Sequence, residues 1–158
     1  MGFALPASLG VKLAVGNKPV ISVIGDGDFL MTVQELATAV QYKLPVVCVV
    51  LNNMGWLSIR DLQFDIFGKE RGMSTEFYDT EGELYSPDYA ALAQAFGAHG
   101  EKIQKGEEVK PALERAFASG KPAVIEVVVN REHPYSDGKA AGWWDVPIPS
   151  YLRGDRKL

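Results

Sequence analysis

The sequence predicts an α/β domain with a doubly wound, mostly parallel sheet that carries helices on both faces. Continuous apolar, β-branched runs at residues 19–24, 46–51 and 123–129 have the composition of strands covered on both sides. Between these runs lie segments whose apolar residues recur with helical spacing. An alternation of strands and helices is the pattern of parallel βαβ units, so one α/β domain accounts for the chain.

Length and composition limit the possible classes of protein. The chain has 158 residues, of which 47% are hydrophobic, enough for one domain with its own core. We expect residues 1–130 to form this domain and residues 131–158, rich in proline and glycine, to pack as a tail on the domain or on a partner subunit. The net charge of −4 is spread among both signs, which argues against nucleic acid or a membrane surface as a partner. The lone Cys48 cannot form an intramolecular disulfide and is predicted to be a core residue, which fits a cytoplasmic protein.

The amino-terminal half is predicted to be a helix followed by one βαβ unit. Apolar residues recur with helical spacing over residues 5–15, and the first strand follows at 19–24. The sequence TVQE at 32–35 has the spacing of a capping box and predicts the start of the next helix. The strand at 46–51 completes the unit. Because Met1 and Gly2 lead almost directly into a helix, we also expect further sequence upstream.

The second half contains one long irregular segment and a further pair of helices and strands. Residues 55–82 are too many for a simple connection in a compact domain, so we expect a partly helical functional loop. Ser86 followed by proline predicts the start of a helix over 87–96. A short, polar edge strand at 98–103 and a helix at 107–118 precede the last strand.

Polar residues follow two strands that should be neighbours. Asp26 lies between Gly25 and Gly27 directly after the first strand, and Asn53 follows the second. Open parallel sheets place their ligands at the carboxyl ends of their strands. Glycines allow close approach of a ligand to the backbone, and helix starts suit phosphates, but Asp26 would repel a bare phosphate. A divalent cation such as Mg²⁺ between carboxylate and phosphate resolves this conflict.

The motif GDG, followed about two dozen residues later by NN, resembles the diphosphate-binding motif of thiamine-diphosphate enzymes. The flanking sequences MGFALPASLGVKLA and FLMTVQELATAVQYKLPVVCVVLNN are similar to the carboxyl-terminal cofactor-binding domain of the acetolactate-synthase-like branch. The resemblance is specific over residues 1–53 and looser as far as residue 130. It implies the thiamine-diphosphate-binding fold and a transferase or lyase that acts on 2-oxo acids as a decarboxylase or carboligase. A Rossmann-like nucleotide site is disfavoured because the turn reads GDGD instead of G-x-G-x-x-G.

The resemblance also implies a set of site residues. Asp26 and Asn53 match the side-chain ligands of Mg²⁺, and Gly55 matches the residue whose carbonyl completes the protein ligands. Met1 falls where a bulky apolar side chain holds the cofactor in its bent shape. The backbone N–H groups of residues 27–29 fall where the family holds the diphosphate. The complete set of expected cofactor-binding residues is Met1, Gly25, Gly27, Asp28, Phe29, Asn53 and Gly55.

Two departures from the family pattern concern the site itself. The family often has a small hydroxyl residue at position 28, so the carboxylate of Asp28 must point away from the diphosphate, toward a metal-bound water or a neighbouring cation. The segment after Asn53 does not match acetolactate synthase itself. Trp56, Ile59 and Arg60 could line the substrate side, with Arg60 holding a substrate carboxylate. The alternative is a solvated arginine beside a packed tryptophan.

A further departure is the absence of a catalytic residue. The family activates its cofactor with a glutamate from a separate pyrimidine-binding domain, usually across a subunit interface. None of Glu35, Glu70 and Glu76 is expected to replace it. We therefore expect the chain to be the last third of a longer enzyme or one subunit of a split enzyme, acting in a homo- or hetero-oligomer. The alternative function is a non-catalytic scaffold or regulatory subunit that retains Mg²⁺-diphosphate binding.

The remaining candidates are weaker. Trp143 and Trp144 are interpreted either as a lid over the site or as anchors at a subunit interface, and the interface is slightly favoured. His99 and His133 have no partner at metal-ligand spacing and are predicted to be structural or solvent-facing. The identity of the 2-oxo acid depends on the 54–82 loop, the tail and a further domain.

Overall fold

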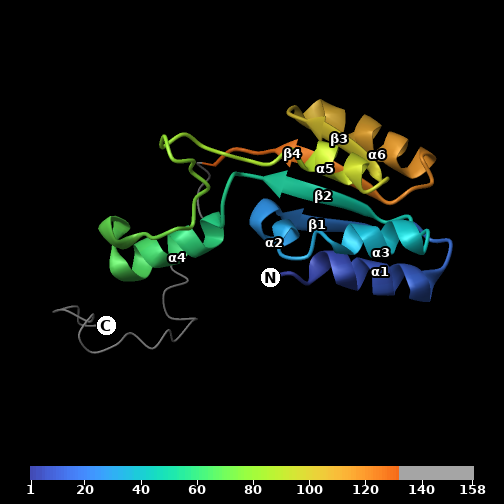
Figure 1. Ribbon diagram of the computed structural model, residues 1–158, viewed down its shortest axis with the longest axis horizontal. Coiled ribbons are helices and arrows are strands. Elements are labelled where there is room, and N and C mark those ends of the chain that lie inside the picture. The colour runs from blue at the N-terminus through green and yellow to red at the C-terminus, as the bar shows by residue number, and fades with distance from the viewer. Residues whose placement is uncertain (132–158) are drawn as a thin grey trace.

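The computed structural model describes residues 1–131, except for the side chain of Asp65. In this part of the chain, four parallel strands form one sheet in the order β1-β2-β4-β3 (Figure 1). The strands are β1 Ile21–Gly25, β2 Val47–Asn52, β3 His99–Ile103 and β4 Ala123–Val128. The predicted strands and the parallel α/β class are confirmed, and β3 lies at the sheet edge as expected.

Helices cover both faces of the sheet. The first face packs against α1 Ala4–Val15, α3 Glu35–Gln41 and α5 Tyr89–Ala95. The second face packs against α6 Val109–Ala118. Cys48 is fully buried on the first face, as predicted for a core residue. The doubly wound arrangement is therefore present.

The second face is only partly covered within residues 1–131. Ala112 and Ala116 of α6 pack over β2, β3 and β4. On β1 the apolar side chains of Ile21 and Val23 remain 47% and 62% exposed. None of the described helices is long and apolar enough to span a bilayer.

The long segment after β2 is partly helical, as predicted. It contains α4 Leu57–Phe67 and the 3₁₀ turn η1 Lys69–Arg71. Figure 1 shows α4 beyond the carboxyl ends of the strands, away from the helices that cover the sheet. A second 3₁₀ turn, η2 Gly106–Glu108, precedes α6. The segment therefore lies at the edge of the sheet where ligands of α/β domains bind.

Two predicted helix starts are wrong by a few residues. Residues 31–34 form turns, and α3 begins at Glu35 without a side-chain cap, so TVQE is not a capping box. The α5 helix is capped by Asp88, whose Oδ1 accepts a hydrogen bond from Ala91 N at 2.7 Å. Ser86 does not cap α5 because its hydroxyl group accepts a hydrogen bond from the side chain of Asn52.

Candidate cofactor and metal site

Asp26 lies where β1 ends and the short helix α2 Asp26–Leu30 begins. Its side chain is nearly inaccessible, with the residue 1% exposed. Oδ1 accepts a hydrogen bond from Gly27 N at 2.9 Å, and Oδ2 accepts one from Gly55 N at 3.0 Å. One carboxylate therefore joins the end of β1 to the loop that follows β2.

The environment of Asp26 affects its protonation in two opposite ways. Burial raises the pKa of the carboxyl group above its ordinary value because the charged form loses its hydration. The backbone N–H groups of Gly27 and Gly55 oppose this rise because they stabilise the carboxylate. A divalent cation would supply the positive charge that this buried carboxylate lacks.

Asn53 and Gly55 bring two further oxygen atoms to Asp26. The amide oxygen of Asn53 faces the carboxylate of Asp26 and the carbonyl oxygen of Gly55. An NH₂ group in that place would lie 3.3 Å from Asp26 Oδ1 and 2.8 Å from the Gly55 carbonyl oxygen, and it would donate to both. As placed, the Asn53 oxygen faces these two oxygen atoms with no hydrogen atom between them. If the amide turned by half a rotation, its NH₂ group would donate to both oxygen atoms and no cation would be needed.

This oxygen cluster fits the chemistry of Mg²⁺. Neighbouring ligands in an octahedral Mg²⁺ site with bonds of about 2.0–2.1 Å lie about 3 Å apart. The contacts of Asn53 with Asp26 and Gly55 lie close to that separation. Within residues 1–131 no three side chains of His, Cys, Asp or Glu are grouped as a metal site. The described residues therefore offer a hard cation one carboxylate, one amide and one carbonyl oxygen.

The segment that follows the site packs closely against the loop from Asn53 to Gly55. A Cβ atom on Gly55 would lie 2.6 Å from the carbonyl oxygen of Thr75, so this close approach requires glycine. Trp56 N donates to the same Thr75 oxygen at 2.7 Å, and Phe77 N donates to the carbonyl oxygen of Met54 at 3.0 Å. Residues 75–77 thus form one wall of the loop.

Trp56 packs between this wall and the GDG turn. Its indole ring makes an edge-to-face contact with Phe77, with centroids 5.0 Å apart. A Cβ atom on Gly27 would lie 2.1 Å from Trp56 Nε1, so the indole excludes any side chain at position 27. The Nε1 atom is buried and has no hydrogen-bond partner within residues 1–131. Gly27 is therefore needed for packing against Trp56.

Arg60 matches neither of the two alternatives that the sequence left open. Its guanidinium group pairs with Asp61 at 3.0 Å and with Glu76 at 3.4 Å, and the side chain is 12% exposed. It also lies over the ring of Phe64, 5.7 Å from the centroid. These partners hold Arg60 in an internal ion-pair network, so it is neither solvated nor free for a substrate carboxylate in this structure.

The remaining predicted cofactor residues surround α2. The Asp28 carboxylate accepts a hydrogen bond from Gly2 N, and its expected contact with a metal-bound water or a neighbouring cation stays a prediction. Phe29 is fully buried and contacts Tyr89 edge-to-face. Met1 is 74% exposed and open to contact by a ligand. Gly25 also faces open space, because a Cβ atom there would meet nothing within 4 Å.

Of the predicted backbone donors to a diphosphate, one is already engaged. Gly27 N–H donates to Asp26 Oδ1, so a diphosphate would have to compete with that carboxylate for it. Of the three glutamates that were not expected to activate the cofactor, two have ion-pair or hydrogen-bond partners and one is exposed. Glu76 is paired with two arginines, Glu35 accepts from Thr38 at 2.9 Å, and Glu70 is exposed.

A buried polar network beneath the site was missed by the sequence analysis. Glu126 on β4 is 0% exposed and accepts hydrogen bonds from Asn52 Nδ2 at 2.8 Å and Tyr89 N at 3.0 Å. Lys102 Nζ lies 2.8 Å from Glu126 Oε1 and balances its charge. The signal was a single glutamate within the apolar run AVIEVV. A charged residue in a central strand requires buried partners.

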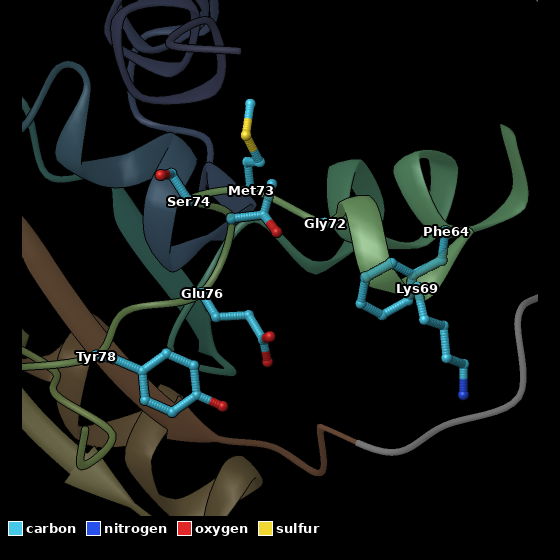
Figure 2. Close-up of a pocket in the computed structure, with 8 residues that line it drawn as sticks. Phe64, Lys69, Gly72, Met73, Ser74, Glu76 and Tyr78 are labelled. Atoms are coloured by element: carbon cyan, nitrogen blue, oxygen red, sulfur yellow. The ribbon is translucent and has the colours of Figure 1, made fainter. Parts of the chain in front are cut away.

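A cavity of about 300 Å³ lies behind the wall of residues 75–77. Figure 2 shows Glu76 and Tyr78 on one side of it and Phe64 and Lys69, from α4 and η1, on the other. It is an open hollow within the 54–82 segment. His99 lies elsewhere, on the edge strand β3, with Nε2 3.5 Å from a carboxylate oxygen of Glu101. His133, Trp143 and Trp144 lie outside the described residues.

The fold and the polar groups at the carboxyl edge of its sheet define an α/β cofactor-binding domain. Residues 1–127 match the family model described as "Thiamine pyrophosphate enzyme, C-terminal TPP binding domain". The chain therefore belongs to the thiamine pyrophosphate enzyme family and contains its carboxyl-terminal cofactor-binding domain. The predicted family and its relation to acetolactate synthases are confirmed.

The relatives of the chain include proteins named as a hydrolase, a synthase and an acetyltransferase. It is 37% identical over 160 residues to the "Putative thiamine pyrophosphate-containing protein YdaP" of Bacillus subtilis, covering 99% of this chain and 26% of the relative. It is 37% identical over 130 residues to the "Acetolactate synthase isozyme 2 large subunit" of Escherichia coli, covering 82% and 22%. The chain thus spans about a quarter of the length of these relatives.

A solved structure has the same fold. The thiamine diphosphate-dependent 4-hydroxybenzoylformate decarboxylase of Rhodococcus jostii RHA1 matches with a TM-score of 0.73 and 30% sequence identity. The match covers 85% of this chain and 24% of the decarboxylase chain. The thiamine-diphosphate-binding fold is therefore confirmed, and the similar proteins include both a synthase and a decarboxylase.

Proposed function

We propose that this chain binds Mg²⁺ through Asp26 Oδ1, Asn53 Oδ1 and the carbonyl oxygen of Gly55, and through it the diphosphate of thiamine diphosphate. The observation that carries the proposal is the convergence of these three oxygens from two neighbouring strand ends. Family membership supports the choice of cofactor. The hydrogen bond from Gly55 N to Asp26 supports a site that is formed before the cation binds.

The chain's own residues have separate roles in this proposal. Asp26, Asn53 and Gly55 hold the cation, and the backbone N–H groups of residues 27–29 donate to the diphosphate, with Asp26 giving up Gly27 N–H. Met1 supports the bend of the cofactor. Thiamine diphosphate, when bound, supplies an electron sink for cleavage or formation of a bond next to a carbonyl group.

The complete activity in this proposal is decarboxylation or carboligation of a 2-oxo acid. The activating glutamate comes from a pyrimidine-binding domain, located elsewhere in a longer protein or on a partner subunit of a homo- or hetero-oligomer. Relatives four times longer than this chain support that arrangement, because the chain covers between 21% and 26% of each. The chain alone is then expected to bind cofactor weakly and to turn over little substrate.

Calorimetry tests the cation site directly. Thiamine diphosphate titrated into the chain should bind in the presence of Mg²⁺ and not in the presence of EDTA. Asp26→Ala should abolish this binding, while Asp79→Asn, at an exposed turn, should leave it unchanged because its amide oxygen can still accept from Glu81 N and Glu83 N. Equal binding by Asp26→Ala would refute the metal assignment.

A second assay separates the enzyme from a scaffold. The chain should be combined with a pyrimidine-binding domain that carries the activating glutamate, and release of CO₂ from pyruvate and related 2-oxo acids should be measured. Activity that appears only in the combined assembly supports the enzyme. A cofactor-loaded assembly that is inactive on the whole panel would favour the non-catalytic Mg²⁺-diphosphate scaffold.

A further inference from the structure

Met54, between the two cation-site residues Asn53 and Gly55, has an unfavourable backbone conformation. Its φ of 61° is in the left-handed region, which residues other than glycine rarely adopt. Such a residue persists only where its surroundings hold it. The loop after β2 must therefore be stabilised by contacts outside itself.

Several of these contacts come from neighbouring segments already described. Met54 N donates to Asn52 Oδ1 at 3.1 Å, and the Met54 carbonyl oxygen accepts from Phe77 N at 3.0 Å. These bonds fix both ends of the Met54 peptide unit. They leave the carbonyl oxygen of Asn53 to be satisfied by another group.

Arg131 supplies that group from the end of β4. Its Nη1 donates to the carbonyl oxygens of Asn53 at 2.7 Å and Met54 at 3.0 Å. Its Nη2 donates to Glu76 Oε1. The side chain is 16% exposed, so most of it is shielded from water. One guanidinium group thus joins the loop after β2 to the wall formed by residues 75–77.

The sheet order explains why a residue so distant in sequence reaches this loop. β4 pairs with β2 in parallel, with Val128 opposite Asn52, and Val129 N donates to the Asn52 carbonyl oxygen at 3.0 Å. The backbone segments that follow β2 and β4 therefore leave the sheet side by side. Two residues later, Arg131 lies beside the loop from Asn53 to Gly55.

Glu76 compensates the charge that Arg131 brings toward a cation site. It contacts Arg131 and also lies 3.4 Å from Arg60, so one carboxylate is shared by two guanidinium groups. Figure 2 shows Glu76 on the extended segment between Ser74 and Tyr78. The same residue pairs through its backbone with Gly55 in an isolated antiparallel bridge. Glu76 therefore holds the loop directly and also orients Arg131.

We propose that Arg131, oriented by Glu76, is a positioning residue that holds the Asn53–Gly55 loop in the shape that the cation requires. The effect of Arg131 on cation binding rests on the proposed function, whereas its effect on the shape of the loop rests on its own contacts. Residues that orient metal ligands typically contribute a factor of about 10–100 to metal affinity. Arg131→Gln is expected to cause a loss of that size.

The first measurement needs no ligand. Amide hydrogen exchange of the 158-residue chain, followed by NMR, should show at least about tenfold faster exchange of the Met54 and Gly55 amides in Arg131→Gln, because opening of the loop is no longer resisted. Exchange of the Val50 amide, in the middle of β2, serves as the reference for global stability and should be unchanged. Arg115→Gln, which removes a surface arginine paired with Glu101, is the matched control.

The second measurement uses Mn²⁺ with thiamine diphosphate, with free Mn²⁺ followed by electron paramagnetic resonance. Arg131→Gln should weaken Mn²⁺ binding about 10- to 100-fold, and Arg131→Lys should recover part of the loss because an ammonium group can donate to one or two of the three acceptors. Glu76→Gln should weaken binding less, since its amide oxygen still accepts from Arg131. Arg115→Gln should bind as the wild type does.

The outcomes separate this inference from the proposed function. Unchanged exchange at Met54 and Gly55 in Arg131→Gln would overturn the positioning role, whatever the ligand does. Faster exchange with unchanged Mn²⁺ affinity would overturn it as well. If the wild-type chain takes up no Mn²⁺ with thiamine diphosphate, the proposed function fails, and the exchange data alone decide whether Arg131 holds the loop.

Discussion

The buried pair of Glu126 and Lys102 predicts an asymmetric response to mutation. Glu126 is fully buried, whereas Lys102 is 38% exposed and can reach water without its partner. In Lys102→Met, the carboxylate keeps its hydrogen bonds from Asn52 and Tyr89 but loses the only cation that faces it among the described residues. Leaving a buried charge without its partner costs about 3–5 kcal/mol. The two remaining donors favour the lower end of that range, about 3 kcal/mol.

Glu126→Gln should cost less because it leaves no buried charge. Its NH₂ group must face either Tyr89 N, which loses one donor contact, or the Asn52 and Lys102 donors, which loses two. A buried polar group left without a partner costs about 1–3 kcal/mol. The double variant Lys102→Met/Glu126→Gln has no buried carboxylate left without a cation. The double variant should therefore be about 2 kcal/mol more stable than the sum of the single losses predicts.

Urea denaturation followed by circular dichroism measures these differences in the free energy of unfolding. The m-value should stay constant across the four proteins. Lys110→Met is the control, because Lys110 is 87% exposed and its removal should change stability by less than about 0.5 kcal/mol. A Lys102→Met variant as stable as this control, or strictly additive losses in the double variant, would refute the argument that Lys102 compensates the Glu126 charge.

Three further predictions concern single residues. Gly100→Ala should lower stability by about 1–3 kcal/mol in thermal melts, because the new Cβ would lie 2.0 Å from the Ala90 carbonyl oxygen, and an unchanged melting temperature would contradict this. Cys48 should resist alkylation until the chain unfolds, since burial covers the thiol and raises its pKa, and rapid labelling of the native chain would contradict this. Hydrogen bonding by Arg115 lowers the pKa of the Glu101 carboxyl group below its ordinary 4.5. The stability that this hydrogen bond gives to the folded state is therefore present above that pH and is lost as the pH falls through the folded-state pKa. Glu101→Gln should therefore cost less than about 1 kcal/mol near neutral pH and nothing in strong acid, and a loss that persists in acid would contradict the assignment.

The fold was predictable because β2 and β4 are largely buried on both faces, although β1 keeps Ile21 and Val23 exposed on one face within residues 1–131. Continuous apolar runs mark such strands in the sequence, and three of the four were identified from this signal. The edge strand β3 was predicted as a short, polar strand, and its sequence HGEKI is indeed largely polar. The helix starts were less predictable. Asp88 and Ser86 are both good capping residues. The Ser86 hydroxyl group accepts a hydrogen bond from Asn52, a residue distant in sequence, and Asp88 caps the helix.

The candidate site was predictable only in the parts that follow a strand directly. Asp26 and Asn53 follow two consecutive parallel strands, so local sequence and sheet geometry suffice to bring them together. Arg131 and Glu76 are not distinguishable in the same way. Their roles depend on the pairing of β4 with β2 and on the path of the 54–82 segment, and both are long-range features. An arginine after a strand and a glutamate in a loop are common on any protein surface.

The adjacent asparagines show how one strand end serves two purposes. Successive side chains of a strand point to opposite sides, so Asn52 and Asn53 cannot share an environment. Asn52 points into the core, where it satisfies Glu126, Ser86 and the Met54 amide. Asn53 points to Asp26 and Gly55, where its amide faces a carboxylate oxygen and a carbonyl oxygen. The amide oxygen of Asn52 thus helps to hold the backbone kink that directs the Gly55 carbonyl toward Asn53. The buried network and the proposed cation site are consequently linked through Met54, which Arg131 holds from the other side.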